Sequence, residues 1–140
     1  MKTAAEDLQI EALGNAGCPV LCLVGDVDMR TAPELRAALQ KLFGNRHPQR
    51  LVLNLTEVRH MDSSGLSVLL EAWQEARRSN TRFVLAALNN GPRRLLERTR
   101  LSDVLETAET LEQAVDEADL QMFDPLLHSF HLGQKSRPAI

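Results

Sequence analysis

The sequence lacks the features that place a chain in a membrane or outside the cell. Its apolar runs fall well short of the roughly 18 residues that a membrane-spanning helix needs. The first residues, 1–7, have no apolar core of the kind that a secretory signal peptide carries. We therefore expect a cytoplasmic protein that does not insert into a membrane.

Cysteine and net charge are also scarce. The 140 residues include two cysteines, Cys18 and Cys22, and the formal net charge is −3 at pH 7. In one strand these cysteines would lie on the same face but too far apart to form a disulfide, so we expect two reduced packing residues. The small charge gives no general attraction to nucleic acid or to a membrane. With 44% hydrophobic and 25% charged residues, the composition is that of an ordinary globular domain.

The motifs of several common enzyme classes are missing as well. The glycine-rich phosphate loops are absent, and neither Ser63 nor Ser64 has the glycine two positions earlier that a hydrolase nucleophile elbow requires. The four histidines have no metal-ligand spacing with the cysteines. His60 precedes Ser63 by three residues and could act as its base, but an exposed loop histidine is the simpler interpretation. We predict a protein that is not an enzyme and that holds neither a cofactor nor a metal.

Strand patterns and helix patterns alternate along the chain. Residues 8–13 alternate between apolar and polar, and the run 20–24 is apolar throughout, so the two segments predict an antiparallel hairpin with an edge strand. The later strands are expected at 51–55, 82–88 and 104–105. Helices are expected at 31–44, at 62–78, from 90 onward and at 111–118; the first and last begin with the capping boxes Thr31-Ala32-Pro33-Glu34 and Thr110-Leu111-Glu112-Gln113.

This alternation predicts an α/β fold in which the strands after the hairpin run parallel, because each helix carries the chain back across the sheet. The turns that lead from strand to helix then share one edge of the sheet, where open α/β sheets usually place their function. That edge collects Asp26, Asp28, Thr31, Asp62, Ser63, Asn89 and Asn90. We expect a domain at 1–118 and an extension at 119–140 that either docks as a last helix or stays loosely attached.

The stretch from His60 to Leu66 joins a buried strand to an amphipathic helix. Asp62, Ser63 and Ser64 sit where that helix begins, and short polar side chains are favoured there because they accept hydrogen bonds from unpaired amides. A serine at this place could also carry a phosphoryl group, since the dianion would face free amides and the positive end of the helix dipole.

Two motifs carry a resemblance to a known family. The run Met61-Asp62-Ser63-Ser64-Gly65-Leu66, with Asn54 and the motif Gly25-Asp26-Val27-Asp28-x-x-Thr31-Ala32-Pro33-x-Leu35, resembles the anti-anti-sigma factor family over about residues 7–118. The resemblance implies the STAS fold, a mixed sheet of about five strands with about four helices. It also implies that the unphosphorylated protein binds an anti-sigma factor, a serine kinase, and thereby releases a sigma factor.

By position in the motif, the kinase would use ATP and magnesium to phosphorylate Ser63, and a serine phosphatase would reset it. The same resemblance assigns partner binding to Asp28, Thr31, Asn54, Asp62, Ser63, Ser64 and Gly65, with Asp28 and Asn54 shaping the pocket around the serine. For Asp28 and Asn54 a loop cap and a hydrogen bond at the edge of the core remain open alternatives.

Other functions are also compatible with parts of the sequence. A STAS module of a lipid-transport or stressosome assembly would bind partners without a phosphorylation cycle. A magnesium-dependent receiver-like enzyme would need an aspartate directly after strand 51–55 and a lysine after the last strand, and neither is present. A basic group that includes Arg77, Arg78, Arg93 and Arg94 is either a solvated face or a surface that steers an acidic partner.

Overall fold

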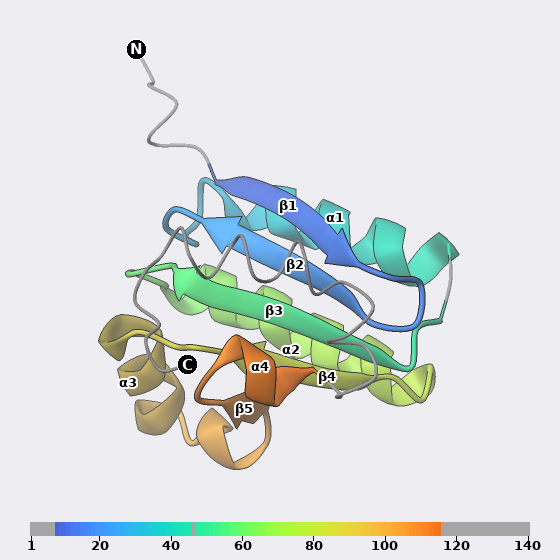
Figure 1. Cartoon of the computed structure of the whole chain (residues 1–140). Helices are drawn as coiled ribbons and strands as arrows, with labels where there is room; N and C mark the ends of the chain where they lie inside the picture. The colour runs from blue at the N-terminus through green and yellow to red at the C-terminus, as the bar shows by residue number, and fades with distance from the viewer. Residues whose placement is uncertain (1–7, 46, 116–140) are drawn as a thin grey trace.

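The computed structural model describes residues 8–45 and 47–115 as one five-stranded sheet with helices on both faces. Helices α1 and α2 lie behind the sheet in Figure 1, and α4 lies in front of it. The strands are β1 (Gln9–Gly14), β2 (Pro19–Val24), β3 (Arg50–Glu57), β4 (Arg82–Ala86) and β5 (Glu106–Ala108). The helices are α1 (Ala32–Asn45), α2 (Ser63–Arg78), α3 (Asn90–Arg98), the 3-10 helix η2 (Leu101–Asp103) and α4 (Leu111–Ala114).

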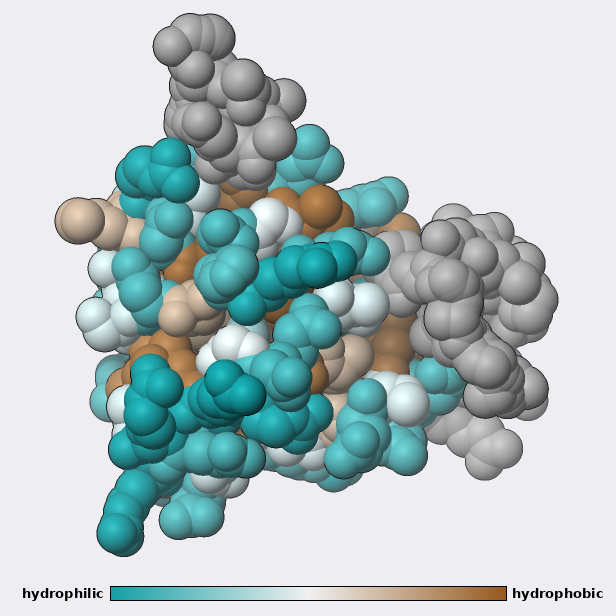
Figure 2. Space-filling model, turned by 90° about the vertical axis from the view of Figure 1, so that its left-hand side faces the viewer, coloured by the Kyte–Doolittle hydropathy of each residue, from teal (hydrophilic) through white to brown (hydrophobic). Residues whose placement is uncertain are grey.

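The strands lie in the order β1-β2-β3-β4-β5. Strands β1 and β2 pair antiparallel, and every later pair is parallel, which confirms the predicted hairpin and the mixed α/β sheet. Parallel pairing brings the carboxyl ends of β2, β3 and β4 to one edge of the sheet. Figure 2 views this edge face-on, and most of its surface is hydrophilic, with apolar patches between the polar groups.

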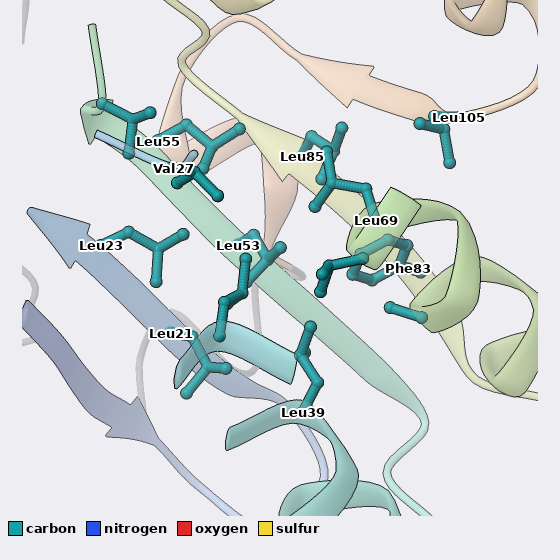
Figure 3. Packing of buried hydrophobic residues seen from close by; sticks show 14 of the residues in the cluster. Leu21, Leu23, Val27, Leu39, Leu53, Leu55, Leu69, Phe83, Leu85 and Leu105 are labelled. Atoms are coloured by element: carbon teal, nitrogen blue, oxygen red, sulfur yellow. The ribbon is translucent and has the colours of Figure 1, made fainter. Parts of the chain in front are cut away.

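Alternation along the strands divides the apolar side chains between the two faces of the sheet. Leu53 and Leu55 of β3 point toward α1 and α2, where they join Leu39 and Leu69 in the larger cluster (Figure 3). Leu51 belongs to the same cluster. Cys18, Val20, Cys22, Val52 and Val84 belong to a smaller cluster on the opposite face, with side chains of α4. Both cysteines are buried there and neither is in a disulfide, as the sequence predicts.

The last predicted strand is misplaced by two residues. Residues 104 and 105 close a turn, because the amides of Val104 and Leu105 both donate to the carbonyl oxygen of Leu101, at 3.0 and 2.8 Å. Pairing with β4 begins only at Glu106, which lies opposite Val84. The strand predicted at 82–88 is likewise shorter, since Ala87 has a φ of 60° and leaves the extended conformation.

The two capping boxes differ in outcome. Thr110 caps α4 as predicted and accepts from the Gln113 amide at 3.2 Å. The Thr31 hydroxyl is instead used inside the loop before α1, where it donates to the Asp26 carbonyl at 2.8 Å and accepts from the Asp28 amide at 3.0 Å. The predicted end of the last helix, the domain boundary at 118 and the extension 119–140 lie outside the described residues.

Candidate functional site

Two loops that are far apart in sequence are joined at the edge where β2 and β3 end. Val27 and Met61 form an isolated parallel bridge. The Val27 amide donates to the His60 carbonyl at 3.0 Å, and the Asp62 amide donates to the Val27 carbonyl at 3.1 Å. The loop that carries Asp26 therefore lies against the loop that leads into α2, and His60 Nδ1 is 3.5 Å from an Asp26 carboxylate oxygen.

Helix α2 begins as the sequence predicts, with Asp62 as its N-cap. One carboxylate oxygen of Asp62 accepts from the Ser64 amide at 2.9 Å and from the Gly65 amide at 3.3 Å. This satisfies two of the amides that have no partner within the helix. The side chain of Ser63 takes no part in this cap and is exposed, whereas Ser64 is half-buried. Ser63 is thus the accessible hydroxyl at a positively polarised helix end.

Gly65 allows α2 to begin close to the bridge between the two loops. A Cβ atom at this position would lie 2.7 Å from Val27 Cγ1, 2.8 Å from Met61 Cγ and 3.0 Å from the Val27 carbonyl oxygen. No real Cβ tolerates such distances, so a larger residue would push the helix start away from the loop. Gly65 is buried, and the close approach that it allows sets where Asp62 and Ser63 lie.

Asp28 is held ionised by the loop before α1. Its carboxylate accepts from the Arg30 amide at 2.9 Å, from the Thr31 amide at 3.3 Å and from Arg30 Nη2 at 3.2 Å. Desolvation alone would raise the pKa of Asp28, but these hydrogen bonds and the Arg30 charge outweigh it and leave the pKa below its ordinary value. Thr31 is 3% exposed, so it supports this loop from inside.

Asn54 does not join the group around Ser63. Its side chain lies with Cys22 and Val52 on the face opposite α2, and it is 1% exposed. The amide donates to Cys22 Sγ at 3.4 Å, and the carbonyl accepts from the Thr56 hydroxyl at 2.6 Å and the Thr56 amide at 3.2 Å. In this conformation Asn54 cannot touch a partner. Of the two alternatives that the sequence leaves open for Asn54, the structure shows the hydrogen bond at the edge of the core.

A tether that the sequence does not reveal holds the loop before α2. The side-chain amide of Asn89 donates to the carbonyl oxygens of Thr56 and Val58 at 2.9 Å each, and to that of Leu55 at 3.4 Å. Asn89 occupies the N-cap position of α3 but makes no side-chain cap there. An asparagine before a helix was the available signal, and it points to a local cap rather than to a bond across the sheet edge.

The basic residues do not form one surface. Arg77 and Arg78 end α2, while Arg93 and Arg94 lie near the start of α3, at the edge of the sheet that carries Ser63. Arg77 lies over the Trp73 ring at 5.0 Å from its centroid, and Arg78 pairs with Glu75 at 2.7 Å. Arg77 and Arg78 of the predicted basic group are therefore engaged in local contacts along α2.

The part of the chain that the structure describes contains neither a metal site nor a membrane-spanning helix. No cluster of three or more histidine, cysteine, aspartate or glutamate side chains is placed to hold a metal ion. No described helix combines the length and the apolar character needed to cross a bilayer.

The edge built around Asp62 and Ser63, on a five-stranded mixed sheet, can be compared with known proteins. A model of the STAS domain matches residues 9–114. The chain belongs to the STAS domain family. This STAS domain is 37% identical over 84 residues to the anti-sigma-B factor antagonist of Listeria monocytogenes. The match covers 60% of this chain and 73% of the relative. It is 25% identical over 114 residues to the anti-sigma F factor antagonist of Paenibacillus polymyxa, covering 81% and 97% of the two chains.

Solved structures agree with this assignment. An anti-sigma factor antagonist from Mycobacterium paratuberculosis has a TM-score of 0.73 and 25% identity, and the match covers 88% of this chain and 99% of that one. The unphosphorylated antagonist SpoIIAA has a TM-score of 0.67 at 22% identity, over 79% of this chain and 95% of its own, a likeness of fold.

Proposed function

We propose that this STAS domain is an anti-sigma factor antagonist whose binding is switched off by phosphorylation of Ser63. The observation that carries the proposal is the separation of roles at the start of α2, where Asp62 caps the helix and Ser63 stays exposed. A kinase can reach such a hydroxyl without opening the fold. The names of the curated relatives support the class of partner, an anti-sigma factor.

The charge of a phosphate explains why the phosphorylated domain stays folded and why it no longer binds its partner. In the free protein, a phosphate on Ser63 would gain about 0.3–1 kcal/mol from the helix end. In a complex the same group would be desolvated beside Asp62, and a single like-charge pair at about 4 Å costs roughly 4 kcal/mol at an effective dielectric of about 20. Half of that energy weakens binding more than tenfold. Repulsion in the complex, and not unfolding, is the proposed switch.

The partners follow from this scheme. The anti-sigma factor is itself the serine kinase, which uses ATP and magnesium, and a serine phosphatase removes the phosphate. Asp28, Asp62, Ser63 and Ser64 supply the contact surface, while Thr31, Gly65 and Asn54 act from inside the fold. The domain works in the cytoplasm as a binding module without turnover of its own, and it engages neither nucleic acid nor a membrane.

The test is to incubate the protein with the kinase-type anti-sigma factor and ATP and to measure its intact mass. One added phosphate is expected on the wild type and on Ser64→Ala, and none on Ser63→Ala. Peptide mapping that finds the phosphate mainly on Ser64 or on Thr56 contradicts the assignment. Stable binding to a partner with no phosphorylation would instead favour a STAS module of another assembly.

A further inference from the structure

Three large apolar side chains are exposed in the part of the chain that the structure describes. Met29 is 73% exposed, Val104 is 42% exposed and Val24 is 41% exposed. Two of them lie at the edge of the sheet that carries Ser63, because Val24 ends β2 and Met29 lies in the loop between β2 and α1. Single exposed apolar side chains are common on protein surfaces, so the surroundings of Met29 decide what its exposure means.

The backbone is fixed on both sides of Met29. Before it, the Asp28 amide donates to the Thr31 hydroxyl at 3.0 Å, and after it, the Arg30 amide donates to the Asp28 carboxylate at 2.9 Å. The Asp28 carbonyl oxygen also accepts from the amides of Thr31 and Ala32, at 3.1 and 2.7 Å. Met29 therefore projects from an ordered turn. A loop that is already ordered loses little backbone freedom when a partner binds it.

Met29 also lies within reach of a partner that covers Ser63. The pairing of Val27 with Met61 joins the two loops, and the Val27 carbonyl accepts from the Asp62 amide at 3.1 Å. Met29 and Ser63 each follow this pair by two residues, so each Cα lies at most about 8 Å from it. A standard interface covers about 800 Å² of each partner, a patch roughly 30 Å across, and therefore includes both residues.

We infer that Met29 is an apolar anchor of this interface and enters a hydrophobic depression on the surface of the anti-sigma factor. The assignment rests on the proposed function, which supplies the class of partner. Asp28 and Arg30 flank Met29 and pair with each other at 3.2 Å, with side chains 27% and 54% exposed, so they form a polar rim beside it. Methionine is enriched at interfaces, where a few central side chains surrounded by polar groups supply most of the binding energy. Ser63 then controls the contact, and Met29 supplies its apolar area.

Affinity for the kinase-type anti-sigma factor, measured by calorimetry, tests the anchor. Met29→Ala should bind at least about tenfold more weakly than the wild type. Met29→Leu keeps the apolar volume and should bind within about threefold of the wild type. Val104→Ala is the matched control and should bind like the wild type, because Val104 is also exposed but precedes β5 and lies toward the other edge of the sheet. Urea denaturation should show wild-type stability for all three variants, and a folded Met29→Ala with wild-type affinity overturns the inference.

The kinetics of phosphorylation by the same kinase separate the anchor from the proposed function. Met29 does not touch the reacting atoms, so Met29→Ala should raise the KM for this protein several-fold and leave kcat within about twofold of the wild-type value. A lowered kcat at unchanged KM overturns the anchor. If the wild type is bound and phosphorylated and Met29→Ala has the same kinetics, the anchor alone is wrong. If the wild type is neither bound nor phosphorylated, the proposed function and the anchor are both wrong.

Methyl NMR of the complex observes the contact without a substitution at the interface. In protein with ¹³C-labelled methionine methyl groups, the Met29 signal is assigned from its absence in Met29→Leu. On addition of the anti-sigma factor, this signal should shift and show NOEs to aliphatic or aromatic protons of the partner. A Met29 methyl group whose signal neither shifts nor gains such NOEs in the formed complex overturns the inference.

Discussion

The Asp62 carboxylate accepts a hydrogen bond from the Ser64 amide at 2.9 Å, while the side chain of the intervening Ser63 remains exposed. The two tasks at the start of α2 are therefore divided between neighbouring residues. Asp62 satisfies the free amides, and Ser63 is left available for chemistry. The Asp62 cap does not use the Ser63 hydroxyl, so we expect α2 to stay folded when a group is added to Ser63.

Substitution of Gly65 should destabilise the fold, because α2 approaches the Val27 and Met61 loop too closely to admit a methyl group. We expect Gly65→Ala to lower the free energy of unfolding by about 1–3 kcal/mol, the usual range for overpacking. Gly44→Ala is the matched control: it lies in α1, nothing is within 4 Å of the added Cβ, and it should gain about 0.5–1 kcal/mol from helix propensity. Urea denaturation decides, and equal effects of the two substitutions would contradict the close approach.

The start of α2 could be predicted from sequence because all of its signals are local. The apolar stripe of Leu66, Leu69 and Ala76 gives the helical period, and the polar residues from Asp62 onward mark its beginning. The sequence predicts the short strand β5 two residues too early, because Val104 and Leu105 are apolar. Val104 is nevertheless 42% exposed, and only pairing with β4 defines the strand. Three residues carry too little pattern to fix a register.

Within the candidate site, the sequence does not predict the contacts of residues whose partners or orientation depend on the rest of the fold. Asn89 bonds carbonyls more than 30 positions away, and nothing near Asn89 in the sequence distinguishes such a tether from a helix cap. Thr31 matches a capping box, yet its hydroxyl bonds within the preceding loop, an alternative that short polar side chains always offer. Asn54 matches the family motif, but strand alternation turns it to the face opposite α2.

Removal of the Asn89 side chain should loosen the loop that leads to Ser63. Asn89→Ala leaves the Thr56 and Val58 carbonyls without this donor, which costs about 1–3 kcal/mol where such groups are shielded from water. Because Asn89 makes no side-chain cap on α3, helix capping does not confuse the result. Hydrogen exchange should be faster at the amides of residues 58–62. Asn90→Ala, at an exposed neighbouring position, should leave hydrogen exchange and stability unchanged. If both variants behave alike, the Asn89 hydrogen bonds do not hold the loop in place.

The ionisation of Asp28 should depend on Arg30. Since Arg30 supplies a side-chain donor and a charge, Arg30→Ala should raise the pKa of Asp28 toward its ordinary value, while the backbone donors keep part of the effect. A lowered folded-state pKa stabilises the protein above the unfolded-state value near 3.9, and this stabilisation is lost as the pH falls through the folded-state pKa. The variant should therefore lose less stability on acidification below about pH 4.

Carboxyl NMR titration of Asp28 measures the pKa directly, and urea denaturation between pH 2 and 5 measures the linked stability. Arg78→Ala is the control, because Arg78 pairs with Glu75 near the other end of α2. An Asp28 pKa that is the same in Arg30→Ala and in the wild type would mean that the backbone amides alone hold the carboxylate ionised.

Variants of Ser63 separate repulsion from structural collapse as the cause of partner release. Ser63 is exposed and the cap belongs to Asp62, so the free energy of unfolding of Ser63→Ala should lie within about 0.5 kcal/mol of the wild-type value. The variant should also bind the anti-sigma factor even in the presence of ATP. Ser63→Asp should also fold, because a carboxylate is favourable at a helix N-terminus, but it should bind at least several-fold more weakly. One charge in place of nearly two makes it a partial mimic.

Stability by urea denaturation and affinity by calorimetry must be measured on the same preparations of the Ser63 variants. An aspartate variant that fails to bind because it has unfolded refutes the repulsion mechanism. An aspartate variant that is stable and binds like the wild type removes Ser63 from the interface.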